Sequence, residues 1–164
     1  MQDVKLIRAQ PNDIALISSL ARTIWQQHYP SIISQAQIDY MLDRMYSSAT
    51  LEKQMQEGVF YFLILHGTEP LGFISVNEEN EGEWFLGKFY INQEKGAKGI
   101  GSAAFGRLLT VISPKKIRLT VNRQNYKSIN FYFKNGFTIS EVADFDIGNG
   151  YVMNDFVMVW KKPE

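Results

Sequence analysis

Apolar residues recur along this chain in two patterns, and each pattern predicts a different kind of element. Where they fall three or four residues apart they form one face of a helix, and where they cluster over a few residues they are typical of strands. The helical pattern covers residues 14–27, 38–45, 48–57, 98–113 and 127–135. The strand pattern covers residues 4–8, 59–65, 71–76, 84–91, 117–121, 138–145 and 151–160.

Polar and small residues separate these elements. Residues 66–70 and 147–150 are typical of hairpin loops, and the acidic stretch 77–82 predicts a mobile loop. The first helical pattern stops before Pro30, because the residue that precedes a proline disfavours the helical conformation. The order of elements predicts an α/β fold, a mixed sheet with helices on both faces, built as a single domain over residues 1–164.

Residues 89–102 change from an aromatic strand to a small-residue loop and then to a helix. Gly96, Ala97, Gly99 and Gly101 form most of the loop. The first N–H groups of a helix lack internal partners, and the helix dipole favours an anion there, so the stretch predicts a phosphate cradle. A tight turn without a ligand accounts for the glycines equally well. The spacing matches neither the P-loop nor the dinucleotide-binding motif.

Composition narrows the functional classes. Seventeen basic residues balance seventeen acidic ones, so no basic surface for nucleic acid or a membrane is predicted. The chain has no cysteine and two histidines, which excludes disulfides and a thiolate nucleophile and predicts that no metal is bound. The first residues lack the pattern of a signal peptide, and no apolar run approaches the ~18 residues of a membrane-spanning helix. We therefore expect a cytoplasmic protein.

Two stretches together resemble motifs of the GNAT superfamily, the acyl-CoA-dependent N-acyltransferases. Residues 96–101 are similar to its motif A, Gln/Arg-x-x-Gly-x-Gly/Ala, except that Gly96 stands where glutamine or arginine is usual. The stretch from Asn125 to Phe137 matches Asn-x-x-Ser/Ala-x-x-x-Tyr-x-x-x-Gly-Phe at every fixed position. The resemblance extends over nearly the whole chain. It implies the GNAT fold, whose central mixed, mostly antiparallel and twisted sheet of about seven strands has helices on both faces.

The resemblance also implies an activity, the direct transfer of an acetyl group from acetyl-CoA to a primary amine without a metal. It implies that Tyr132 is the general acid, a role that suits a phenol because its pKa of ~10 keeps it protonated at neutral pH. The strand ending at Ile91 should diverge from the strand beginning at Ile117, so that pantetheine pairs with exposed backbone. The residues expected to bind acetyl-CoA are Phe89, Tyr90, Ile91, Gly96, Ala97, Lys98, Gly99, Ile100, Gly101, Ser102, Asn125, Ser128 and Asn130.

The reaction also needs a base, because an alkylamine with a pKa of ~10 is protonated at neutral pH. The strand that leads into the cradle has no acid in its interior, so Glu83 at its start is the first candidate. A solvated strand end is the simpler interpretation of Glu83. A water relay, or a carboxylate from residues 77–83 or from the 144–155 hairpin, is an equally open alternative.

Aromatic residues near the break between the first two helices are candidates for an acceptor site, although packing between the helices is the simpler interpretation. The acceptor-binding residues proposed from the sequence are Trp25, His28, Tyr29 and Trp84. The opening helices resemble a bacterial branch that includes polyamine (spermidine and spermine) acetyltransferases linked to sporulation control, which implies a small amine as the partner. The alternatives are a protein N-terminal or lysine acetyltransferase and a non-catalytic acyl-CoA-binding module. The last strands are a candidate homodimer interface.

Overall fold

A twisted sheet forms the centre of the computed structural model, which describes residues 3–164. The strands are β1 (Val4–Arg8), β2 (Phe60–His66), β3 (Glu69–Asn80), β4 (Glu83–Ile91), β5 (Lys116–Asn122), β6 (Thr138–Gly148) and β7 (Tyr151–Lys161). The helices are η1 (Pro11–Asp13, a 3-10 turn), α1 (Ile14–His28), α2 (Gln35–Tyr46), α3 (Ser48–Gln56), α4 (Ile100–Ile112) and α5 (Tyr126–Lys134). The strand order is β1-β2-β3-β4-β5-β7-β6. Neighbouring strands are antiparallel except β4 and β5, which are parallel.

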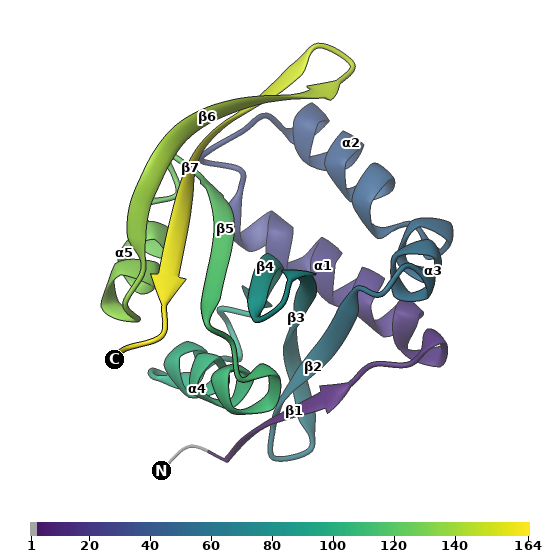
Figure 1. The fold of residues 1–164 in the computed structure, drawn as a ribbon. Coiled ribbons are helices and arrows are strands. Elements are labelled where there is room, and N and C mark those ends of the chain that lie inside the picture. Colours follow the sequence, from purple (N-terminus) through teal and green to yellow (C-terminus); the bar gives the residue numbers. More distant parts are fainter. Residues whose placement is uncertain (1–2) are drawn as a thin grey trace.

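Each face of the sheet has its own hydrophobic core. On one face α1, α2 and α3 contribute Trp25, Tyr46 and Leu51 to a cluster with side chains of β2 and β3. On the other face α4 and α5 contribute Phe105 and Ile129 to a second cluster. Figure 1 shows the two groups of helices on either side of the strands. The fold expected from the sequence is thereby confirmed.

One predicted segment is wrong. Residues 77–82 do not form a mobile loop, because β3 continues to Asn80 and pairs Asn77 with Phe85 and Glu78 with Trp84. The turn is limited to residues 81–82, where Gly82 takes a φ of +74°. The polar side chains of this segment lie on the end of a hairpin that is exposed to solvent. Such a polar sequence is also typical of a loop.

The predicted helix that begins at residue 98 starts two residues later. Gly99 adopts the left-handed φ of 90° and caps α4, so the helix itself begins at Ile100. The predicted break before Pro30 is confirmed, since Tyr29 caps α1 and its N–H bonds the carbonyl oxygen of Trp25. The end of α1 lies near the segment that joins β4 to α4, since the side chain of Gln27 accepts a hydrogen bond of 2.9 Å from the backbone N–H of Gln93.

Candidate functional site

The sheet opens between its two parallel strands. Residues 83–85 of β4 pair with residues 116–118 of β5, and within residues 3–164 no later residue of either strand continues this pairing. Through Ile91, β4 stays paired with β3, and through Asn122, β5 stays paired with β7. Both strands therefore present backbone N–H and C=O groups toward the gap, where an extended ligand can pair with them.

A cavity of about 350 Å³ lies at the end of this gap. Residues 96–102 line it from the loop and first turn of α4, together with Lys127 and Lys134 of α5. Within residues 3–164 no side chain caps α4; the N–H of Ile100 donates to the carbonyl oxygen of Ala97 at 3.3 Å, and the next amide groups, of Gly101 and Ser102, are available to an anion. A Cβ added to Gly101 would lie 2.8 Å from the ring of Phe131, which shows how closely backbone and aromatic ring approach here. The cavity thus offers amide hydrogen-bond donors, lysine side chains and enough volume to hold a diphosphate group.

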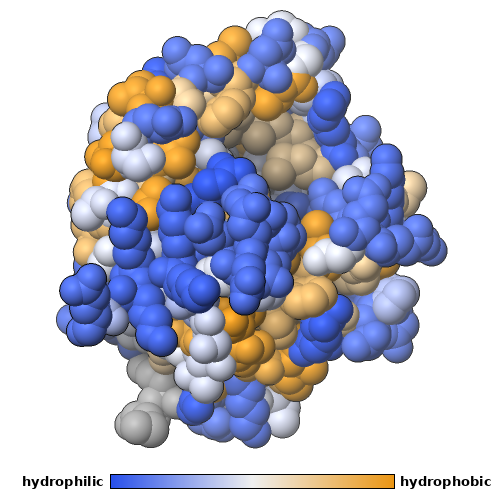
Figure 2. Space-filling view, in the orientation of Figure 1, coloured by the Kyte–Doolittle hydropathy of each residue, from blue (hydrophilic) through white to orange (hydrophobic). Residues whose placement is uncertain are grey.

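A second cavity, of about 400 Å³, lies on the other side of the gap. Its walls come from the end of α1, from α2, β4, β5 and α5, and from the β6–β7 hairpin, and they are mainly apolar and aromatic. Figure 2 shows a hollow with an apolar floor and a hydrophilic rim between the hairpin and α2. Tyr29 and Tyr90 share a hydrogen bond of 3.1 Å between their hydroxyl groups in this wall.

The two cavities meet at three residues, Phe89, Ser128 and Tyr132, which line both. Tyr132 is nearly buried on α5, and the ring of Phe137 packs against it at 5.3 Å. Asn125 caps this helix by accepting a hydrogen bond of 3.3 Å from the backbone N–H of Ser128. Burial raises the pKa of Tyr132 well above the usual value for a phenol, so its hydroxyl keeps its proton throughout the physiological range.

Most residues expected to bind acetyl-CoA lie around the first cavity, and the others are divided. Phe89, Ile91, Ser128 and residues 96–102 line the first cavity. Tyr90 and Asn125 line the second cavity instead. Asn130 is exposed on α5 and lies outside the lining of both cavities in the described chain.

The residues expected to bind the acceptor are also divided. Trp25 and Tyr29 line the second cavity, whereas His28 lines the first. Trp84 packs in the core against Phe60, with ring centroids 5.9 Å apart, because consecutive residues of a strand point to opposite faces and its neighbour Phe85 takes the cavity side.

Glu83, the first candidate for the base, is exposed at the start of β4. There β4 and β5 are still paired, and Glu83 is the register partner of Lys116 in β5. It lies outside the lining of both cavities in the described chain. Asp155 of β7 is the acid that lines the second cavity, and it is 4% exposed. Its position lies within the 144–155 hairpin that the sequence left open as a source of the base, and only the pairing of the strands distinguishes it from the other acids of that hairpin.

The structure bears on two expected absences. Within residues 3–164, no three histidine, cysteine, aspartate or glutamate side chains are grouped so that they would hold a metal ion. In the same part of the chain, no helix has the length and apolar character needed to cross a membrane.

Comparison with known proteins gives one family and consistent relatives. The acetyltransferase (GNAT) family matches residues 19–137. A spermidine N(1)-acetyltransferase of Thermoplasma acidophilum is 25% identical over an alignment of 152 residues that covers 87% of this chain and 93% of that protein. The crystal structure of the PaiA N-acetyltransferase from Thermoplasma acidophilum, in complex with coenzyme A, has a TM-score of 0.80 at 23% identity and covers 97% of this chain and 99% of its own. Mutant forms of the spermidine/spermine N-acetyltransferase SpeG from Vibrio cholerae have a TM-score of 0.68 at 19% identity, with 97% and 94% covered.

The matched region contains both motifs, the cradle at residues 96–101 and the stretch from Asn125 to Phe137. It also contains β4, the opening beside it and Tyr132, so family and geometry agree on the same part of the molecule. The chain belongs to the GNAT family and is an acetyltransferase.

Proposed function

We propose that this acetyltransferase moves an acetyl group from acetyl-CoA to a primary amine of a small molecule, and that the acceptor is a polyamine. The observation that carries the proposal is the meeting of the two cavities at Phe89, Ser128 and Tyr132. One cavity suits a diphosphate and the other suits an amine with an apolar stem. Two substrates that enter from opposite sides can then react directly in a ternary complex.

The chain's own groups divide the work. When bound, acetyl-CoA supplies an acetyl group activated as a thioester. Amide groups of the loop and of the first turn of α4, those of Gly101 and Ser102 among them, bind the diphosphate, and the unpaired backbone of β4 orients the arm that reaches into the gap. A backbone N–H near Phe89 or Tyr90 stabilises negative charge on the carbonyl oxygen. Tyr132, protonated and at the junction, donates its proton to the sulfur that leaves.

The second cavity supports a small cationic acceptor. Its apolar and aromatic lining suits methylene chains, and Asp155 supplies an acid within it. The charge of Arg118, which also lines it, is paired with Glu79 through bonds of 2.7 and 2.6 Å. Two of the relatives are named as spermidine acetyltransferases.

A contact across the rim favours a small acceptor over a long peptide. The hydroxyl of Tyr40 on α2 donates to the carbonyl oxygen of Ile147 at 2.9 Å, which joins α2 to the β6–β7 hairpin beside the cavity. The tip of the hairpin lies over the start of α2 in Figure 1. An extended peptide would have to displace this bridge to cross the cavity on that side.

The test follows free thiol released from acetyl-CoA with a panel of spermidine, spermine, amino acids, aminoglycosides and short peptides. Tyr132→Phe is compared with the wild type, and Tyr126→Phe, an exposed tyrosine on the same helix, is the matched control. We expect turnover with polyamines, a fall of at least ~10-fold in Tyr132→Phe, and no change in Tyr126→Phe.

Each outcome has a different meaning. Turnover with peptides alone would replace the polyamine by a protein acceptor, and turnover untouched by Tyr132→Phe would remove this residue as the acid. Calorimetric binding of acetyl-CoA without turnover on any amine would favour a non-catalytic binding module.

A further inference from the structure

Side chains at alternate positions of β7 face the second cavity. Met153 and Asp155 line it, as the period of two along a strand requires. Asp155 is 4% exposed, and its Oδ1 atom has no hydrogen-bond partner within residues 3–164. A buried carboxylate oxygen without a partner is costly in free energy, so a fold that keeps one beside a cavity points to a ligand that supplies the missing contact.

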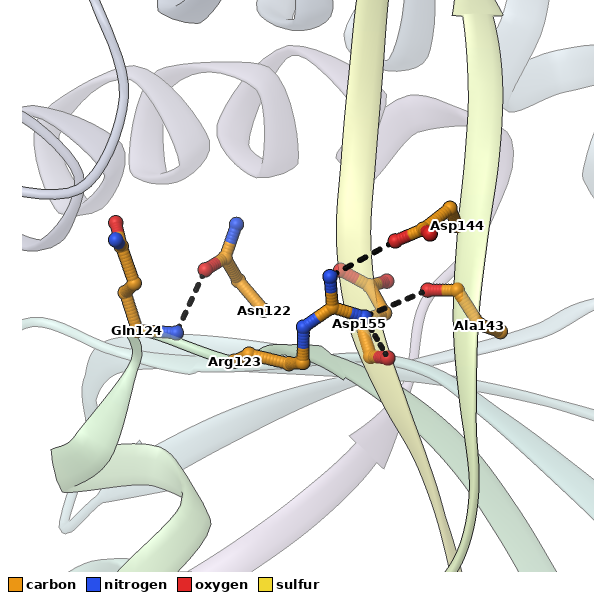
Figure 3. A network of polar contacts seen from close by, with 6 residues as sticks. All are labelled: Asn122, Arg123, Gln124, Ala143, Asp144 and Asp155. Atoms are coloured by element: carbon orange, nitrogen blue, oxygen red, sulfur yellow. Dashed lines mark hydrogen bonds and ion pairs between the residues drawn. The ribbon is translucent and has the colours of Figure 1, made fainter.

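The neighbouring arginine does not supply that contact. The Nη1 atom of Arg123 donates to the backbone carbonyl oxygens of Ala143 at 3.4 Å and of Asp155 at 3.2 Å. Its Nη2 atom donates to the carboxylate of Asp144 at 2.9 Å. Figure 3 shows the guanidinium between β6 and β7 with these three contacts. Arg123 thus joins the backbones of two strands and the exposed acid, and the buried Oδ1 atom of Asp155, a residue that lines the cavity, is left without a partner in the described chain.

We propose that Asp155 is the catalytic base, which takes the proton that the acceptor's ammonium group must lose before it attacks. The assignment rests on the proposed function and gives Asp155 the role first considered for Glu83, which lies outside the cavity lining in the described chain. Tyr132 lines the same cavity from α5, so an acid and a base reach it from different elements. An ammonium group held at Asp155 also gains the ionic contact that Oδ1 lacks.

Asp155 and Tyr132 together account for every proton that moves in the reaction. The carboxylate of Asp155 takes one proton from the ammonium group, and the neutral nitrogen forms a bond to the acetyl carbon while the carbon–sulfur bond breaks. Tyr132 gives its phenolic proton to the sulfur. The nitrogen loses a second proton, which returns to Tyr132 through solvent, and Asp155 releases its proton to solvent. The products are the acetamide, the thiol and one proton.

The surroundings of Asp155 keep its carboxyl group in the range that a base requires. Burial raises its pKa from 3.8 to about 6, against the opposing effects of a hydrogen bond with Thr120 and the charge of Arg123. The group is therefore ionised at neutral pH, yet its proton affinity is higher than that of an exposed carboxylate. The titratable and charged groups that line the same cavity or interact electrostatically with Asp155 are Tyr29, Tyr90, Arg118, Arg123, Tyr132 and Asp144.

The experiment compares the wild type, Asp155→Asn and Asp144→Asn. Asparagine keeps the shape of the side chain and removes the basic oxygen, and Asp144 is an acid of the same network whose side chain is 62% exposed. The kcat/KM for the acceptor found by the panel is measured by thiol release from pH 5 to pH 9, and acetyl-CoA binding is measured by calorimetry. We expect Asp155→Asn to lower kcat at least ~100-fold, to abolish the decline in kcat/KM below pH 6, and to bind acetyl-CoA normally. Asp144→Asn should retain the rate and keep the acidic decline, which should move slightly to lower pH because the charge of Asp144 raises the pKa of Asp155.

The outcomes separate this assignment from the proposed function. If Asp155→Asn keeps its rate, or if the acidic decline persists in it, the proposal is overturned and the decline belongs to another group, such as His28, whose pKa burial lowers. If the wild type acetylates no amine, both proposals fall together. Should Asp155→Asn lose acetyl-CoA binding, Asp155→Ser provides the same comparison with a smaller side chain, and normal turnover in it overturns the assignment.

Discussion

Replacement of Asp155 by asparagine is expected to stabilise the fold while it slows the reaction. Burial raises the pKa of this carboxyl group from 3.8 to about 6, so at neutral pH the folded protein carries a charge that burial disfavours. A shift of roughly 2 pH units corresponds to about 3 kcal/mol, at 1.36 kcal/mol per unit. Because solvent screens the carboxylate through the cavity, and because the new amide also lacks a partner, we expect a gain of about 1–2 kcal/mol at pH 8.

The gain in stability of Asp155→Asn over the wild type should decrease as pH falls. Between about pH 4 and pH 6 the folded wild type holds a proton on Asp155 that the unfolded chain has released, so the stability of the wild type falls as pH rises through this window. Asparagine does not titrate. The advantage of the variant is therefore fully present above about pH 6 and declines toward zero as pH falls to about 4.

Urea unfolding at pH 8, 6 and 4.5, followed by tryptophan fluorescence, measures the difference. A gain of 1–2 kcal/mol moves the urea midpoint upward by ~0.5–1 M if m is ~2 kcal/mol per M. Asp144→Asn removes a surface ion pair with Arg123, so it should lose no more than ~1 kcal/mol. If Asp155→Asn is less stable than the wild type at pH 8, the carboxylate makes a stabilising contact in the folded protein. If the stability advantage of the variant is the same at all three pH values, the raised pKa of Asp155 is not its cause.

Three further predictions concern packing and charge. Gly101→Ala brings a Cβ to 2.8 Å from the ring of Phe131, so calorimetry should show at least ~10-fold weaker acetyl-CoA binding while the protein stays folded. Gly72→Ala places a Cβ 2.0 Å from the carbonyl oxygen of Tyr90, and urea unfolding should show a loss of more than ~2 kcal/mol because the β3–β4 pairing must open. Burial lowers the pKa of Lys88 to about 8, so wild-type stability should rise from pH 7.5 to pH 9.5, and Lys88→Met should abolish this rise.

Local patterns predicted most of the fold. The strand at residues 4–8 has the predicted bounds, and the strand at 84–91 begins one residue earlier, because a compact apolar run next to a turn is enough to define a strand. The prediction for residues 77–82 failed because the end of β3 is exposed at residues 78–80, where the alternation of apolar and polar residues disappears although the strand continues to pair with β4. The cytoplasmic location, the homodimer and the link to sporulation control stay predictions.

The site was predictable only in part, for a physical reason. Much of the first cavity comes from one continuous stretch of strand, loop and helix, which the motif at 96–101 predicted, and the motif that begins at Asn125 predicted much of its α5 wall. The second cavity is assembled from α1, α2, β4, β5, α5 and the β6–β7 hairpin, most of which are distant from one another in the sequence. Nothing in composition distinguishes Asp155 from Asp144, since their difference lies in which face of a hairpin each side chain occupies once the strands have paired.

The opening between β4 and β5 has a consequence for the protein's tendency to aggregate. A strand edge at the border of a sheet can recruit a strand from another molecule, and proteins protect such borders with charges, prolines or bulges. Here two further edges lie in the middle of the sheet, where β3 and β7 complete the other side of each strand. The helices on both faces surround this slot, so a flexible ligand can thread into it more readily than a folded neighbour can add a strand. The protein thus maintains an exposed hydrogen-bonding surface at a site where it poses little risk of self-association.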